Sequence, residues 1–303
     1  MSLLPGSRED LGALAYGLGW SAVRHLPERL AYAAAERTAD SVWARRGKQV
    51  RRLESNLARV FPQAPESELR VLSRAGMRNY LRYWCDTFRM PDWDHRRIID
   101  RITPIDDHIL TEALAEGRGV VLALPHMGNW DHAGAWACLV HQQVITVAER
   151  LKPESVYEKF LEYRRQLGME VIPHDGEGIN VFDTLRSRLE AGGFLALVAD
   201  RDLSSSGLQV DFFGEPIRVP IGPARLAIQT GAPLVTATVY YDGPQTVVHI
   251  GPRIDIPAQG SLRERLAMVA QSVTKRFEDS VSAHPTDWHM LSRLWLADLA
   301  DGS

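Results

Sequence analysis

A short apolar run in the middle of this chain ends in a turn of polar residues. Residues 119–124 read Gly-Val-Val-Leu-Ala-Leu, too short and too rich in Val and Leu for a helix, so they predict a buried parallel strand. Pro125 and Gly128 break that strand, and residues 131–140 look helical. This succession is typical of an open α/β sheet, in which binding and catalytic groups lie where the strands end.

Strand and helix patterns alternate along the chain after residue 106. The expected strands are 119–124, 144–148, 170–173, 194–199, 234–241 and 246–250. The expected helices are 131–140, 153–167, 181–190, 222–230 and 262–283. This alternation predicts an α/β fold with a mixed, mainly parallel central sheet flanked by helices on both faces.

The first hundred residues are different, because they carry helical periodicity without strand signals. Residues 9–47 and 48–101 both have this pattern. We therefore expect a single domain of 303 residues, with a helical N-terminal portion, 1–105, packed on an α/β body, 106–303.

Residues 9–47 allow two interpretations. Leucines recur at helical spacing, aromatic residues such as Trp43 are interspersed, and a basic cluster lies between residues 41 and 60. This combination fits an amphipathic element lying on an anionic membrane surface. The same periodicity also fits helices packed on the core of the protein itself.

Composition excludes several classes of protein. The net charge of −3 argues against general affinity for nucleic acid. Cys85 and Cys138 are the only cysteines, which suggests a reducing compartment and not a disulfide scaffold. No signal peptide is visible, and the apolar run 11–23 is shorter than the roughly 20 residues of a membrane span. We expect a cytoplasmic protein, or one that lies on a membrane without crossing it.

The turn after the first strand holds a candidate acid–base pair. His126 and Asp131 are five residues apart, so a turn can bring the carboxylate to one imidazole nitrogen. A carboxylate placed there would fix the tautomer and let the other nitrogen accept a proton from a hydroxyl. The alternative is a structural histidine followed by an Asp that caps the next helix. We favour the catalytic interpretation.

Charged residues also follow two other expected strands. Glu149 comes directly after residues 144–148, and Asp200 and Arg201 follow the strand at 194–199. If the strands are parallel, these residues meet His126 in one cleft, although charges at strand ends can also be simple salt bridges. Arg164, on the helix after Glu149, could orient a polar acceptor or could be an ordinary exposed arginine.

Aromatic residues form two further features. Tyr83 and Trp84 belong to a stripe at helical spacing, which predicts core packing first and the lining of an acyl or sugar pocket second. Residues 207–215 combine two aromatic residues with a turn, which suggests a loop beside the cleft.

Other chemistries lack their motifs. There is no G-x-S-x-G sequence for a serine hydrolase and no Walker sequence. A metallo-hydrolase cluster would need ligands at Met127 and Asn129, beside Asp131 and His132, so we expect no metal site. The chemistry that remains is metal-free acid–base catalysis at a hydroxyl group.

The residues taken together carry a family likeness. His126 and Asp131 resemble the H-x4-D/E motif of glycerolipid-type acyltransferases. Further blocks at 56–62, 200–202, 210–214, 223–232 and 285–288 resemble the lipid A late-acyltransferase family. Within that family, residues 148–154 and 287–291 are most similar to the actinobacterial phosphatidylinositol mannoside acyltransferases, which carry Glu at the position of Asp200. The likeness runs from about residue 56 to residue 295.

This resemblance implies a peripheral enzyme on the cytoplasmic face of the plasma membrane. It would move a fatty acyl chain, typically palmitoyl, from acyl-CoA as cosubstrate to the 6-hydroxyl of a mannose on phosphatidylinositol mannoside, with no other cofactor. An acyltransferase acting on lipid A or another glycolipid shares every motif. A non-catalytic lipid-binding module is the alternative from another class.

The mechanism that we expect uses His126 as general base and Asp131 to orient it. Backbone N–H groups at the start of the following helix would stabilise the oxyanion. Asp200 and Glu149 would hold the sugar hydroxyls. The acceptor phosphate or its hydroxyls would be bound by Arg164 and Arg201.

Overall fold

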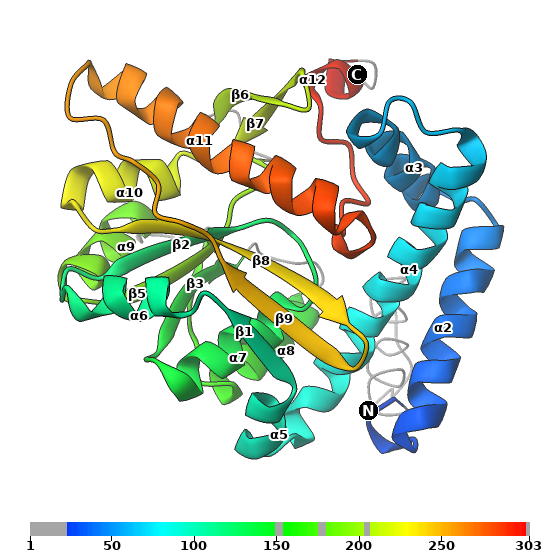
Figure 1. The fold of residues 1–303 in the computed structure, drawn as a ribbon. Helices are drawn as coiled ribbons and strands as arrows, with labels where there is room; N and C mark the ends of the chain where they lie inside the picture. The colour runs from blue at the N-terminus through cyan, green and yellow to red at the C-terminus, as the bar shows by residue number, and fades with distance from the viewer. Residues whose placement is uncertain (1–22, 149–153, 175–179, 203–206, 301–303) are drawn as a thin grey trace, which may run out of the picture.

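The computed structural model describes residues 23–148, 154–174, 180–202 and 207–300. Its centre is a seven-stranded sheet of order β1-β9-β8-β2-β5-β3-β4, in the middle of Figure 1. The pair β8 and β9 is antiparallel and the other neighbouring pairs are parallel. The mixed, mainly parallel sheet predicted from the alternating pattern is confirmed.

The elements have the following bounds. The strands are β1 (Ile102–Ile105), β2 (Val120–Leu124), β3 (Val144–Ala148), β4 (Glu170–Pro173), β5 (Phe194–Val198), β6 (Leu208–Phe212), β7 (Glu215–Val219), β8 (Leu234–Asp242) and β9 (Gln245–Ile250). The α-helices are α2 (Glu28–Ala44), α3 (Lys48–Val60), α4 (Glu66–Arg89), α5 (His95–Asp100), α6 (His108–Ala115), α7 (Trp130–Val140), α8 (Glu154–Gln166), α9 (Val181–Glu190), α10 (Gly222–Thr230), α11 (Leu262–Ala283) and α12 (Leu296–Ala300). Two 3₁₀ turns, η1 (Met90–Asp92) and η2 (Pro285–Asp287), complete the list.

Helices cover both faces of the sheet, as the central strand β2 requires. Val121 and Ala123 belong to one core, which β2 shares with α9, α10 and α11. Val120, Leu122 and Leu124 point the other way, into a core shared with α5, α6, α7 and α8. Side chains alternate between the faces of a strand, so an entirely apolar run fits only a strand that is buried on both sides. Figure 1 shows the two helical layers above and below the sheet.

The helices α2, α3 and α4 form a separate layer at one side of the sheet (Figure 1). Ala39, Leu53 and Met77 contribute one buried residue from each helix to a small core of their own. The helix α2 therefore packs on the protein through one face. Trp43, expected as an interfacial aromatic, instead donates its indole N–H to Ser73 at 3.0 Å and lies under the guanidinium of Arg70.

Two predictions about secondary structure were wrong. Residues 102–105 were placed at the end of the helical portion, but they form β1, an edge strand paired with β9. Pro104 hides the strand signal, and an edge position tolerates it. The expected loop at 207–215 is the start of the β6–β7 hairpin. Phe213 and Gly214 both have positive φ, 53° and 81°, as a tight two-residue hairpin turn requires.

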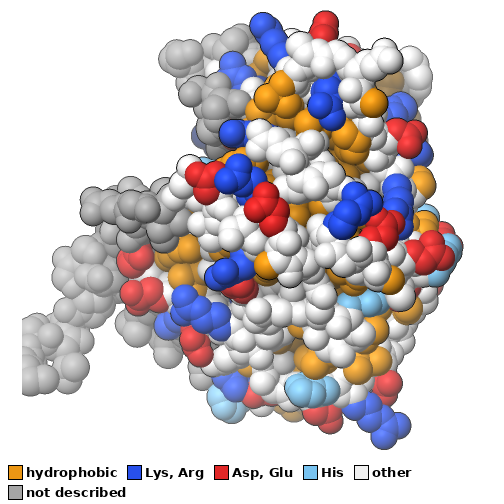
Figure 2. Space-filling view, turned by 90° about the vertical axis from the view of Figure 1, so that its left-hand side faces the viewer, with side chains coloured by type: hydrophobic (Ala, Val, Ile, Leu, Met, Phe, Trp, Pro, Cys, Tyr) orange, Lys and Arg blue, Asp and Glu red, His pale blue; other side chains and the backbone are white. Residues whose placement is uncertain are grey.

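The surface mixes charges of both signs. On the face drawn in Figure 2, basic and acidic side chains lie interspersed among apolar ones. Exposed ion pairs such as Arg188–Glu170, at 2.9 Å, are part of this mixture. Within the described ranges, none of the helices has the length and apolar character needed to cross a bilayer.

Candidate active site

The turn between β2 and α7 is fixed by one glycine and one cap. Gly128 has φ 55°, and a Cβ there would lie 2.5 Å from the carbonyl oxygen of Val239, so no other residue fits without displacing the backbone. Asn129 caps α7 by accepting a hydrogen bond from the His132 N–H at 2.9 Å. The backbone that follows His126 is therefore held in one conformation.

His126 contacts Asp200 across two neighbouring strands. The register of β2 and β5 places Leu124 beside Val198, and the two functional residues each follow two positions later. Nδ1 of His126 lies 2.5 Å from Oδ1 of Asp200, and the backbone N–H of His126 donates to Oδ2 at 3.0 Å. The convergence of strand ends predicted from the sequence is confirmed for these two residues.

Exposure differs sharply within this pair. The side chain of Asp200 is 1% exposed, whereas that of His126 is 27% exposed and can be reached by a substrate. Burial opposes the ionisation of Asp200, but the adjacent His126 and the hydrogen bonds to the carboxylate outweigh it, so the pKa of Asp200 is lowered. A buried, ionised carboxylate on Nδ1 leaves Nε2 as the nitrogen that can accept a proton.

Asp131 does not make the contact predicted for it. Its Oδ2 accepts the phenol O–H of Tyr83 at 2.8 Å, and its Oδ1 accepts Nε–H of Arg164 at 2.7 Å. Asp131 lies in the first turn of α7, and its two partners come from other helices, Tyr83 from α4 and Arg164 from α8. The expectation that it holds the His126 ring was wrong, because a neighbouring strand brings Asp200 to Nδ1 instead.

Arg164 and Tyr83 are buried partners of this carboxylate. The Arg164 side chain is 16% exposed, so the alternative of an ordinary exposed arginine was wrong. Burial acts to lower the pKa of Arg164, but Asp131 outweighs it and raises this pKa. Burial and Asp131 together raise the pKa of Tyr83 well above its usual value. Asp131 and Arg164 thus neutralise each other inside the protein.

The aromatic stripe packs between α4, α7 and α8. Tyr83 stacks on Trp130 with ring centroids 4.4 Å apart, and Trp84 meets Phe160 edge-on at 5.6 Å. Tyr83 is 3% exposed. The core interpretation of the stripe is confirmed, and Trp130 in turn lies edge-on to the His126 ring at 5.6 Å.

The remaining predicted residues lie at two strand ends. Arg201 follows Asp200 and donates Nη1–H to Oγ of Ser292 at 2.7 Å. Glu149 follows β3 but lies outside the described residues. Among the described parts of the chain there is no group of three or more His, Cys, Asp or Glu side chains that could hold a metal. His132 is buried instead, with its ring nitrogens against Thr246 and the carbonyl of Ile98.

Residues 9–297 match the protein family described as bacterial lipid A biosynthesis acyltransferase. The chain belongs to this family. It is also similar to the phosphatidylinositol mannoside acyltransferase of Mycobacterium tuberculosis H37Rv, with 43% identity over 290 residues, 95% of this chain and 89% of that protein. The protein of the same name from Mycolicibacterium smegmatis is 42% identical over 298 residues, 98% of this chain and 95% of the relative. The chain is therefore an acyltransferase, and the non-catalytic alternative is set aside.

A C-terminal segment of this acyltransferase was not assigned any role from the sequence. Residues 287–289 run antiparallel to the turn that carries His126, with a bridge between Met127 and Trp288. Gly128 N–H donates to the carbonyl of Asp287 at 2.9 Å, and His289 N–H donates to the carbonyl of His126 at 2.8 Å. We call residues 287–289 the strap. Its sequence block resembled the family, but no local pattern shows which turn it would contact.

The strap also buries two titratable side chains. Burial raises the pKa of Asp287 to about 7, although hydrogen bonds from Tyr241 N–H and Asn79 oppose the shift. Burial lowers the pKa of His289 to about 3, and its Nε2 lies 3.0 Å from the carbonyl of Gly128. A neutral His289 therefore donates to the turn beside His126.

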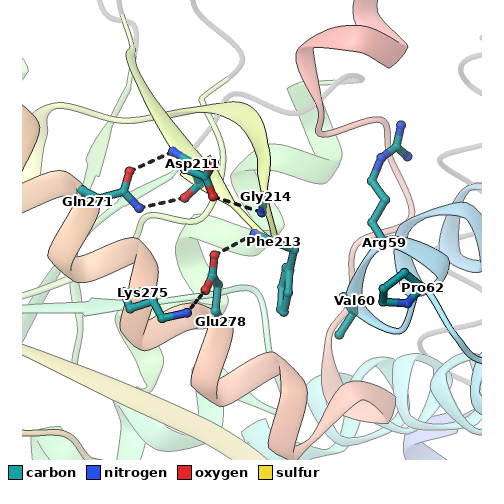
Figure 3. A pocket seen from close by; sticks show the side chains of 9 residues that line it. All are labelled: Arg59, Val60, Pro62, Asp211, Phe213, Gly214, Gln271, Lys275 and Glu278. Carbon is teal, nitrogen blue, oxygen red and sulfur yellow. Dashed lines mark hydrogen bonds and ion pairs between the residues drawn. The ribbon is translucent and has the colours of Figure 1, made fainter.

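A pocket of about 430 Å³ lies elsewhere, between α3, the β6–β7 turn and α11 (Figure 3). Lys275 pairs with Glu278, and Asp211 exchanges hydrogen bonds with Gln271 on the pocket wall. None of the predicted site residues lines it. Its charged groups already have partners, so the pocket offers no arrangement like the contact between His126 and Asp200.

Proposed function

We propose that this acyltransferase transfers a fatty acyl chain, palmitoyl in the simplest case, from acyl-CoA to the 6-hydroxyl of a mannose on phosphatidylinositol mannoside. The mycobacterial relatives of that name, 42–43% identical over nearly the whole chain, support this acceptor. The contact of His126 Nδ1 with the buried Asp200 carboxylate at 2.5 Å is the observation that carries the proposal.

The chemistry begins with a proton transfer. Nε2 of His126 takes the proton of the mannose hydroxyl while Nδ1–H donates to Asp200, which stabilises the imidazolium. The mannose oxygen attacks the thioester carbonyl and a tetrahedral oxyanion forms. When the carbon–sulfur bond breaks, the imidazolium returns its proton to the leaving thiolate, and the products are the mannose ester and CoA.

Further groups assist this step. The N–H groups of Trp130 and Asp131 open α7 and donate to no acceptor among the described residues, so they can receive the oxyanion. Arg164 bonds Asp131 through Nε and keeps its Nη groups for the acceptor. Arg201 and Glu149 complete the acceptor contacts.

We further propose that the enzyme works at the cytoplasmic face of the plasma membrane, on an anionic surface. Leu26, which precedes α2, is 38% exposed, and Leu30 in its first turn is 57% exposed. Arg29 and Arg37 are also exposed on this helix. Apolar and basic side chains together favour an anionic lipid interface.

The test is acyl transfer by the purified protein. Labelled palmitoyl-CoA is offered with phosphatidylinositol mannoside and, separately, with a lipid A precursor, beside the variant His126→Ala. We expect product on the mannoside alone and a loss of about 10²–10⁴-fold in the variant. Product on lipid A would show that the acceptor is lipid A, which the family description allows, and would leave the proposed mechanism unchanged. A variant within a few-fold of the wild type would refute the mechanism.

A further inference from the structure

The carboxylate of Asp200 is buried, and none of the residues that the structure describes gives it a permanently charged partner. Among the described residues, its ion pair is with His126, while the neighbouring Arg201 reaches Ser292. Three contacts hold it: Nδ1 and the backbone N–H of His126, and the indole N–H of Trp288 at 3.2 Å from Oδ2. A buried carboxylate depends on such hydrogen bonds to remain ionised and oriented.

Trp288 is itself fixed before any substrate arrives. It is completely buried, and its backbone bridges Met127, the residue after His126. Its ring packs against Phe212 at 5.9 Å and edge-on against Trp295 at 6.3 Å. A donor held in this way cannot follow Asp200 if the carboxylate rotates, so it defines one orientation for it.

We propose that Trp288 is a positioning residue for the acyl transfer. Its indole N–H anchors Oδ2 of Asp200, which directs Oδ1 at Nδ1 of His126 and leaves Nε2 without a proton for the acceptor hydroxyl. The inference rests on the proposed role of His126 as general base. It adds that the strap, distant in sequence, sets the tautomer and proton affinity of that base.

The indole N–H also acts through its dipole. Its positive end lies near the carboxylate, so it draws negative charge toward Oδ2 and weakens the attraction between Oδ1 and a protonated His126. Removing the N–H raises the proton affinity of His126. Since the base must be neutral to act, the acid limb of the pH–rate profile moves to higher pH.

The chain offers a matched control in Trp295. Trp295 is also completely buried in the same aromatic cluster, but its indole N–H donates to the carbonyl of Phe212 at 3.1 Å and not to Asp200. Trp288→Phe and Trp295→Phe therefore each remove one buried indole donor. We expect comparable losses of stability, so that differences in catalysis report the contact with Asp200.

The experiment measures kcat, KM and the pH profile of kcat for both variants in the full chain. Trp288→Phe should lower kcat about tenfold with little change in KM, the loss expected for one hydrogen bond to a charged group. Its acid limb should move to higher pH. Trp295→Phe should keep kcat within about twofold and leave the limb in place. Equal kcat and equal limbs in the two variants would overturn the inference.

Two controls keep this result interpretable. If Trp288→Phe does not fold, β-(3-benzothienyl)alanine at position 288 preserves the ring shape and removes only the N–H, and the same changes are expected. His126→Ala separates the two proposals. A variant of His126 that remains active refutes the base itself, whereas an inactive one with an unshifted Trp288→Phe profile refutes only the role of the indole.

Discussion

The start of α7 and the end of β5 each bury one carboxylate, and the two are held in opposite ways. Asp131 is 1% exposed and is neutralised by Arg164, with Tyr83 on its second oxygen. Asp200 is equally buried, but its ionic partner is the titratable ring of His126. A carboxylate paired with a permanent cation stabilises the fold, whereas one paired with a histidine can respond when that histidine gains a proton. This difference is the reason that we propose a part in the reaction for Asp200 and a structural part for Asp131.

The largest effect should come from Asp200→Asn. The amide keeps the shape but cannot stabilise the imidazolium, so we expect kcat to fall by about 10²–10⁴-fold with little loss of stability. Steady-state kinetics and urea unfolding of the same preparation measure the two quantities. Full activity in this variant would show that Asp200 takes no more part in the reaction than Asp131 does.

Asp131→Asn should reduce stability more than it reduces kcat. The change leaves Arg164 as an uncompensated buried charge, which costs about 3–5 kcal/mol in the free energy of unfolding. Urea unfolding measures this cost, and the double variant Asp131→Asn with Arg164→Met should recover part of it. A stable variant with greatly reduced kcat would instead place Asp131 in direct contact with the substrate.

Tyr83→Phe should cause a smaller loss of stability than Asp131→Asn. It removes one hydrogen bond to the Asp131 carboxylate and should cost about 1–3 kcal/mol in the free energy of unfolding. Tyr163→Phe is the matched control, because Tyr163 is also buried and its O–H donates to the uncharged sulfur of Met90, at 3.7 Å. Equal losses in the two variants would show that the loss of a buried O–H, and not of its contact with the Asp131 carboxylate, sets the cost.

The smallest expected effect is on the pH dependence of stability, through Asp287 of the strap. The pKa of Asp287 is raised to about 7, so the folded state holds a proton that the unfolded chain releases near pH 4. Stability from this group is present below pH 4 and is lost as pH rises toward 7. Asp287→Asn should flatten that decline in urea unfolding measured from pH 4 to pH 8. An unchanged slope would show that Asp287 is ionised in the fold.

Local sequence predicted much of the sheet and its helices. The bounds of β3, β4, α9, α10 and α11 are confirmed to the residue, because these elements have clear apolar periodicity and sharp ends. The end of α10 at Gly231, with φ 72°, is an example. The edge strand β1 and the hairpin turn at Phe213 lacked such signals, since a short strand with Pro and an aromatic residue at positive φ both contradict local preference.

The sequence by itself determined that His126 follows one buried strand and that Asp200 ends another. Both strands are short apolar runs, and the residues that interrupt these runs mark where the strands end. The tertiary structure alone decided which carboxylate reaches the His126 ring. That choice depends on the order β2-β5-β3, and Trp288 of the strap, 88 residues from Asp200, contacts the same carboxylate; local spacing encodes neither feature. Asp131 is nearer in sequence, but helix geometry turns it to Arg164, while strand register brings Asp200 to His126.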